Sequence, residues 1–149
     1  MCLQIISPFE QDHRLLGAIL TRLSWPAHGS RNFAEGIRHL RICRPAVVVC
    51  ETDLPDGHWQ AVLDAAEELP EPAILIVTSR FADESLWTEV LHRGGYDVLA
   101  KPFDRLEVTR VLGLARQHWL NRRGTASRDR KRRPLNSSHA SPPIPLRCP

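Results

Sequence analysis

The feature that most constrains the fold is a short apolar run at residues 46–50, which ends in Glu51 and leads into the turn sequence Leu54-Pro55-Asp56-Gly57. A continuous run of β-branched residues closed by turn residues predicts a buried parallel strand. In open α/β sheets, ligands bind outside the carboxyl ends of the strands. Glu51 therefore stands where such a fold carries its chemistry, and further candidate residues are expected at the same edge.

The same pattern of strand and helix recurs along the chain. Short apolar or extended segments at residues 3–6, 27–30, 47–50, 73–77 and 96–100 predict five strands. Apolar residues at helical spacing follow each of them, at 15–23, 33–42, 59–69, 84–91 and 106–119. Alternating strands and helices, joined by right-handed crossovers, predict a five-stranded parallel sheet covered on both faces, in the flavodoxin-like doubly wound order.

The charge of the chain is divided between two regions. The net charge is +3 for 149 residues, but residues 121–149 contain eight basic residues and one acidic residue, so residues 1–120 carry −4. Apolar periodicity ends near residue 120, and polar residues and prolines dominate beyond it. We therefore expect one domain at residues 1–120 and a disordered basic tail at residues 121–149.

Composition also limits the class of protein. The four cysteines form no CxxC pair and the histidines have no metal-ligand spacing, so the sequence indicates reduced thiols and no zinc site. No apolar run approaches the roughly 20 residues that span a bilayer, and no signal-peptide pattern opens the chain. We expect a cytoplasmic protein without a membrane association.

Three predicted strand ends bring different polar groups to one edge of the sheet. Glu51 follows the third strand, Thr78 the fourth and Lys101 the fifth. A hydroxyl and an ammonium group both donate hydrogen bonds to anionic oxygens, so the set can handle a negative charge. Alternatively, Lys101 and Glu51 form only an ion pair at the sheet edge, and Thr78 only closes its strand.

This arrangement resembles the receiver domain of bacterial response regulators over about residues 2–119. The resemblance rests on the combination of the Leu54-Pro55-Asp56-Gly57 turn with the Lys101-Pro102-Phe103 ending of the fifth strand. Receivers accept a phosphoryl group on an aspartate that lies four residues before the turn proline. Here Pro55 assigns that position to Glu51.

The resemblance also assigns roles to other positions. It makes Thr78 and Lys101 the residues that read the phosphoryl group, and Val98 the equivalent of the aromatic switch. The acidic pair that holds Mg²⁺ in the family is replaced by Ser7 and Pro8. Because Mg²⁺ requires oxygen ligands such as carboxylates, we expect the metal and the phosphorylation reaction to be lost.

We therefore expect a stand-alone degenerate receiver that acts as a signalling interaction module and not as an enzyme. Glu51 would then imitate a phosphorylated aspartate, with one charge in place of about −1.5 to −2. An alternative is a working phosphoacceptor that uses Glu51, or Asp53 in the following loop, by an unusual route.

Two partner surfaces are expected. Trp87, Tyr96 and Trp119 lie around the fourth helix, fifth strand and fifth helix, a face that receivers use for dimerisation and for contacts with output proteins; core packing is the alternative. The second surface is the basic cluster of the tail, which would bind nucleic acid weakly through phosphate contacts; a simple solvated terminus is the alternative. That cluster consists of Arg128, Arg130, Lys131, Arg132 and Arg133.

Overall fold

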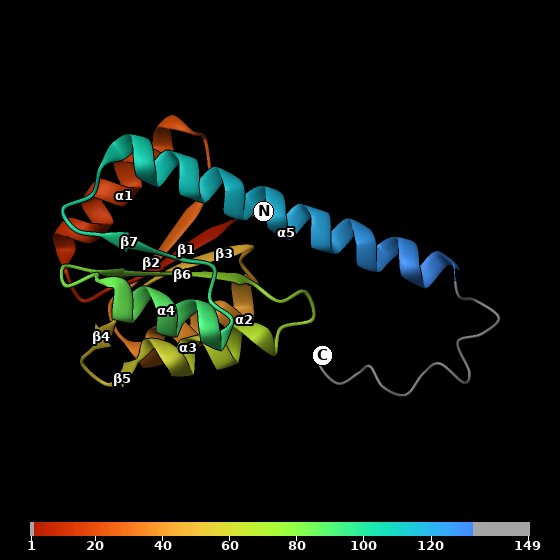
Figure 1. Cartoon of the computed structure of the whole chain (residues 1–149), viewed down its shortest axis with the longest axis horizontal. Helices are drawn as coiled ribbons and strands as arrows, with labels where there is room; N and C mark the ends of the chain where they lie inside the picture. Colours follow the sequence, from red (N-terminus) through yellow and green to blue (C-terminus); the bar gives the residue numbers. More distant parts are fainter. Residues whose placement is uncertain (1, 133–149) are drawn as a thin grey trace.

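The computed structural model describes the backbone of residues 2–132 and the side chains up to residue 123. Five of its strands form one parallel sheet, and five helices cover that sheet (Figure 1). The elements in chain order are β1 (Leu3–Ile6), α1 (Glu10–Arg22), β2 (Ala27–Ser30), α2 (Phe33–Cys43), β3 (Val47–Glu51), β4 (Asp53–Leu54), β5 (Gly57–His58), α3 (Trp59–Glu67), β6 (Ile74–Ser79), α4 (Glu84–Arg93), β7 (Asp97–Ala100) and α5 (Arg105–Arg132).

The sheet has the strand order β2-β1-β3-β6-β7, and every neighbouring pair is parallel. This order confirms the predicted flavodoxin-like arrangement, with its topological switch point between β1 and β3. Glu51 on β3 lies beside Thr78 on β6, and Ser79 lies beside Ala100 on β7. The register therefore brings the ends of the three central strands to one level.

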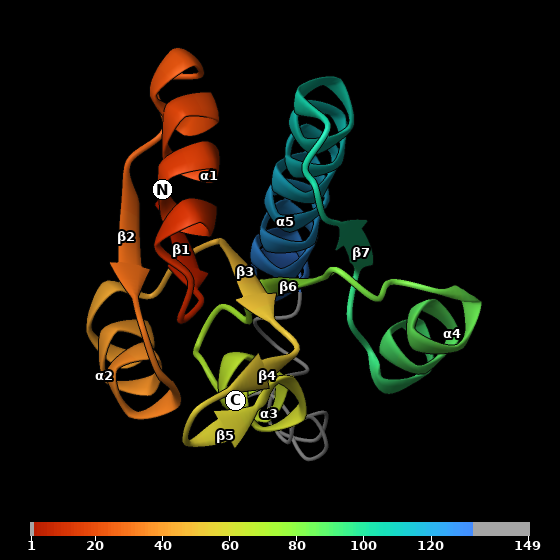
Figure 2. The same cartoon turned by 90° about the vertical axis from the view of Figure 1, so that its left-hand side faces the viewer.

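Helices lie on both faces of the sheet, with α1 and α5 on one side and α2, α3 and α4 on the other (Figure 2). The position of β3 in the sheet explains why its residues 47–50 are all apolar. Val47 and Val49 belong to the core cluster that contains residues of α1 and α5, whereas Val48 and Cys50 belong to the cluster beneath α2 and α3. A strand buried on both faces needs no polar alternation.

A short antiparallel hairpin, β4 and β5, follows β3 where the sequence predicted only a turn. Its turn residue Asp56 accepts hydrogen bonds from the backbone N–H groups of Phe33 (2.6 Å) and Ala34 (3.0 Å). These N–H groups belong to the first turn of α2, where they have no helical partner. Asp56 therefore fastens the loop after β3 to the start of α2.

Helix α5 is longer than predicted, since it continues past residue 120 to Arg132 and projects beyond the sheet (Figure 1). This helix includes residues 121–132, which the sequence analysis assigned to the tail, and the disorder expected of the tail stays a prediction. Apolar periodicity does end near residue 120, but no proline occurs between Arg105 and Pro134, and arginine and lysine are good helix formers. The rest of the predicted tail, residues 133–149, lies outside the described residues.

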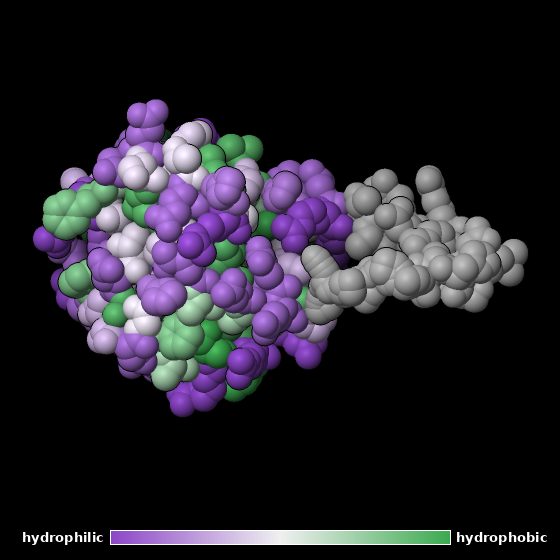
Figure 3. All heavy atoms as spheres, turned by 60° about the horizontal axis from the view of Figure 1, so that its bottom comes forward, coloured by the Kyte–Doolittle hydropathy of each residue, from purple (hydrophilic) through white to green (hydrophobic). Residues whose placement is uncertain are grey.

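None of the helices in the described part of the chain is long and apolar enough to cross a bilayer. Figure 3, which brings the lower face of Figure 1 forward, shows hydrophobic residues dispersed among hydrophilic ones. That face includes α3 and α4 (Figure 1).

Candidate functional site

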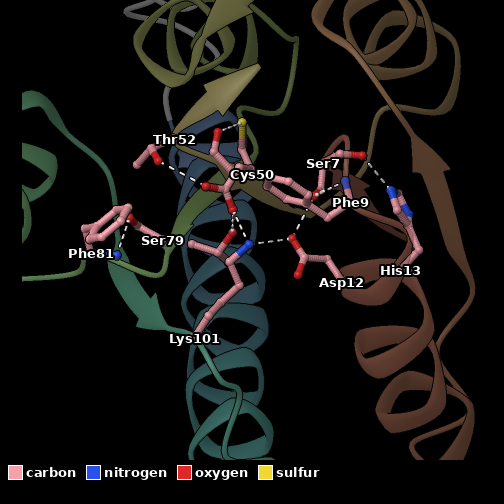
Figure 4. A network of polar contacts seen from close by, with 11 residues as sticks. Ser7, Phe9, Asp12, His13, Cys50, Thr52, Ser79, Phe81 and Lys101 are labelled. Atoms are coloured by element: carbon pink, nitrogen blue, oxygen red, sulfur yellow. Dashed lines mark hydrogen bonds and ion pairs between the residues drawn. The ribbon is translucent and has the colours of Figure 1, made fainter. Parts of the chain in front are cut away.

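A network of polar side chains lies at the carboxyl edge of the sheet (Figure 4). Its centre is Lys101, which directly follows β7 and whose backbone N–H donates to the carbonyl of Ser79 (3.1 Å). The ammonium group lies 2.7 Å from Oε1 of Glu51 and 2.9 Å from Oδ2 of Asp12. One cation is thus held between two carboxylates.

These three charges are almost completely removed from water. The side chains of Lys101, Glu51 and Asp12 are 11%, 7% and 6% exposed. Burying a charge is costly, and the cost is recovered only when the ion pairs are close and the remaining polar atoms have hydrogen-bond partners. The following contacts meet that condition.

Both oxygens of Glu51 are engaged. Thr78 Oγ1 donates to Oε1 (3.2 Å), and Thr52 Oγ1 donates to Oε2 (3.2 Å). With Lys101, the carboxylate has three donors, of which Thr78 lies on the neighbouring strand β6. The structure therefore brings together Glu51, Thr78 and Lys101, which the sequence analysis expected at one edge because each follows a predicted strand.

Asp12, in the first turn of α1, is the member of the site that the sequence analysis missed. Its Oδ2 accepts a hydrogen bond from Ser7 Oγ (2.7 Å) in addition to the contact with Lys101. A signal for it was present, because Asp12 precedes Leu16 and Leu20 by four and eight residues and so shares their buried side of the helix. A carboxylate on the apolar side of a predicted helix marks a buried polar site.

Ser7, which the resemblance matches to one position of the acidic pair of receivers, is a structural link in the network. The residue is buried, and its Oγ accepts a hydrogen bond from the backbone N–H of Phe9 (3.1 Å) while donating to Asp12. The carbonyl of Ser7 lies 2.8 Å from His13 Nε2. Pro8, at the second position, lies half-buried in the loop and brings no carboxylate.

The arrangement does not fit a Mg²⁺ site. Mg²⁺ requires near-octahedral oxygen ligands at short distance. Both carboxylates of the site are directed at the ammonium group of Lys101, and the part of the chain that the structure describes has no group of three His, Cys, Asp or Glu residues placed to hold a metal ion. Lys101 lies between the two carboxylates, where a cation shared by them would otherwise bind.

Cys50, at the position before Glu51, is not a reactive thiol. It is fully buried, and its Sγ lies 3.3 Å from the carbonyl oxygen of Glu51. Burial raises the pKa of the thiol, and the nearby Glu51 carboxylate raises the pKa further. The thiolate that nucleophilic chemistry requires is therefore disfavoured.

The remaining predicted residues lie outside the network. Val98 is half-buried on β7 and packs against the core cluster beneath α2 and α3. Asp53 is exposed on β4 and makes no contact in the network. The side chains of the basic cluster, Arg128, Arg130, Lys131, Arg132 and Arg133, lie outside the described residues.

The predicted partner face needs one correction. Trp119 is only 7% exposed and belongs to the core cluster between the sheet and α5, because it lies seven residues after Leu112 on the inner side of the helix. Tyr96 is partly buried and its ring lies 5.5 Å from that of His118. Trp87 is 47% exposed on α4, where its Nε1 donates to Asp97 (3.3 Å). Of the three, Trp87 is the one available to a partner.

Comparison with known proteins identifies the fold. No family model matches the sequence, and no curated protein matches it. Solved structures do match, and three of them are 15 to 20% identical to this chain. The signal receiver domain of a protein assigned as the LuxO repressor of Vibrio parahaemolyticus has a TM-score of 0.76 at 15% identity, over 83% of this chain and 95% of that domain.

Two further structures agree. The signal receiver domain of an HD domain-containing protein from Pseudomonas fluorescens Pf-5 has a TM-score of 0.72 at 20% identity, over 80% of this chain and 96% of that one. A chain of the CheX–CheY complex from Borrelia burgdorferi, with BeF₃ and Mg²⁺, has a TM-score of 0.68 at 18% identity, over 75% and 86% of the two chains. The chain therefore has the receiver-domain fold.

Proposed function

We propose that this chain is a signalling interaction module on a receiver fold, whose crevice is occupied by its own ion pairs instead of by a phosphoryl group and Mg²⁺. The contact of Lys101 with both Glu51 and Asp12 carries this proposal. The resemblance assigns Lys101 and Thr78 to the phosphoryl group, and both side chains contact the Glu51 carboxylate. Glu51 then acts as a permanent substitute for the modified aspartate.

The residues of the crevice are consistent with a loss of phosphoryl transfer. That reaction depends on metal ions that neutralise charge on the transferring oxygens. In the crevice the carboxylates of Asp12 and Glu51 contact the ammonium group of Lys101, and Ser7 and Pro8 supply no carboxylate. We therefore propose that the module works without phosphorylation, without Mg²⁺ and without catalysis.

Output must then pass through a protein contact. Trp87 and Leu91 on α4 and Leu106 on α5 are large apolar side chains with exposed surface. Large exposed apolar side chains are candidate contacts for a protein partner, and Trp87 and Leu91 lie four residues apart on the same helix. We propose that this α4–α5 face binds a signalling partner or a second copy of the chain.

The test is mass spectrometry of the intact protein after incubation with a small phosphodonor and Mg²⁺. We expect no added phosphoryl group on the wild type. The triple variant Ser7→Asp, Pro8→Asp, Glu51→Asp restores the acidic positions of the family, and we expect some Mg²⁺-dependent modification of it. Modification of the wild type that Glu51→Ala or Asp53→Ala abolishes would instead establish the alternative function of a working phosphoacceptor.

A further inference from the structure

A pocket lies beside the crevice, between α1 and the loop that joins β7 to α5. Its volume is about 620 Å³. Small-molecule sites are commonly clefts of about 300 to 1,000 Å³ with mostly apolar walls and a few polar groups. Its lining includes Phe9 and Leu15, the charged residues Arg80 and Lys101, and Pro102 and Phe103.

The walls of this pocket are apolar on two sides. Phe9 and Leu15 come from the α1 side and are 44% and 40% exposed, while Pro102 and Phe103 come from the opposite loop. The Phe9 ring is held in place, because the Lys101 ammonium group lies 4.5 Å from its centre. An apolar ring system could enter between these walls and remove them from water.

The charges in the pocket are paired, with one exception. Asp12 is paired with Lys101, which it shares with Glu51, and Glu10 forms an ion pair with Arg31. Arg80 follows directly after β6 and is exposed; within residues 2–123 it has neither an ion-pair nor a hydrogen-bond partner. Its planar guanidinium group matches carboxylate, phosphate and sulfonate oxygens.

We propose that this pocket binds a small molecule with a flat apolar body and a single anionic group, with the anionic group on Arg80 and the apolar body between Phe9 and Phe103. A nucleic acid is a poor fit, since its binding relies on many phosphate contacts and the pocket has one unpaired cation. The ligand would lie against Lys101 and Asp12, which belong to both the pocket and the crevice. Binding depends on none of the phosphoacceptor chemistry and so does not rest on the proposed function.

The test uses the full chain and two fluorescent probes. Anilinonaphthalene sulfonate has an aromatic body and one anionic group, and phenylnaphthylamine is its uncharged parent. We expect Arg80→Ala to weaken binding of the sulfonate about three- to tenfold, as an exposed charge-assisted contact does, and to leave the uncharged probe unchanged. The matched control Arg38→Ala, an exposed arginine on α2 outside the pocket, should change neither affinity.

The apolar wall is tested in the same titrations. Phe9→Ala should weaken both probes, and Leu15→Ala provides a second variant that is independent of Lys101. Ile42→Ala, an exposed apolar residue on α2, is the control for that pair. Circular dichroism is used to check that each variant is folded. Equal effects of Arg80→Ala and Arg38→Ala, or of Leu15→Ala and Ile42→Ala, would overturn the proposal.

Discussion

The crevice and the pocket beside it share Asp12 and Lys101, yet they differ in how their polar groups are used. In the crevice, every charge faces a partner within the protein, and Glu51 is bound by Lys101, Thr78 and Thr52. In the pocket, the apolar walls are partly exposed and Arg80 has no partner among the described residues. The buried polar groups of the crevice, which have partners, stabilise the fold. The exposed groups of the pocket, which include an unpaired arginine, are free to bind a ligand. The same edge of the sheet thus carries both kinds of site.

The largest effect is expected from Lys101→Met. Removing the ammonium group leaves two carboxylates, Asp12 and Glu51, buried without a counter-charge, and breaking a buried pair in this way costs about 3 to 5 kcal/mol of stability. Urea denaturation measures it. The control is Arg123→Met, which removes the exposed ion pair with Glu71 and should cost about 0 to 1 kcal/mol. Similar losses of stability in the two variants would mean that the buried ion pairs of the crevice contribute no more than an exposed one.

A smaller loss is expected from Asp12→Asn. The amide keeps an oxygen that accepts from Ser7, and Lys101 keeps Glu51, but one charge-assisted contact is lost, at about 1 to 3 kcal/mol. Asp53→Asn is the matched control, because Asp53 is exposed in the neighbouring hairpin and its replacement should change stability by less than about 0.5 kcal/mol. If both variants were neutral, Asp12 would not be a member of the network.

In the pocket, Phe9→Ala should have a modest effect on stability. The ring is partly exposed, and its contact with the Lys101 ammonium group contributes about 0.5 to 1 kcal/mol. The free energy of unfolding in urea gives the value. A loss as large as that of Lys101→Met would show that the pocket wall supports the fold and would erase the contrast between the two regions.

The smallest effect concerns the loop that fastens β3 to α2. Hydrogen bonds from the backbone N–H groups of Phe33 and Ala34 lower the pKa of Asp56 below its ordinary value. A carboxyl with a lowered pKa in the folded state stabilises the fold above its ordinary pKa, near 4, and the contribution is lost as the pH falls through the folded value. The stability difference between wild type and Asp56→Asn should therefore shrink between pH 6 and pH 2.5. A difference that stays constant would show that the carboxylate does not carry the contact.

The strands and most of the crevice residues could be predicted from the sequence. The five strands were predictable because buried parallel strands are continuous apolar runs, and their register then placed Glu51, Thr78 and Lys101 at one edge. Asp12 was missed because it comes from a helix, and attention to strand ends alone does not find it. The cue was its position on the buried side of α1.

The length of α5, the burial of Trp119 and the pocket could not be predicted from hydrophobic periodicity. Helix α5 continues to Arg132 on local propensity, after its apolar side has ended. The resemblance to receivers made Trp119 a candidate for the partner face, with core packing as the alternative, and the packing of α5 against the sheet places it in the core. The pocket could not be predicted, because the space between α1 and the loop after β7 depends on the conformation of that loop.

The central claim is that Lys101 is engaged by the carboxylates of the crevice, and a double-mutant cycle tests it most directly. Lys101→Met, Glu51→Gln and the double variant are compared in urea denaturation at pH 7. Because the two charged groups are in contact, we expect a coupling free energy of about 0.5 kcal/mol or more. A double variant that loses only the sum of the two single losses in stability would contradict the claim.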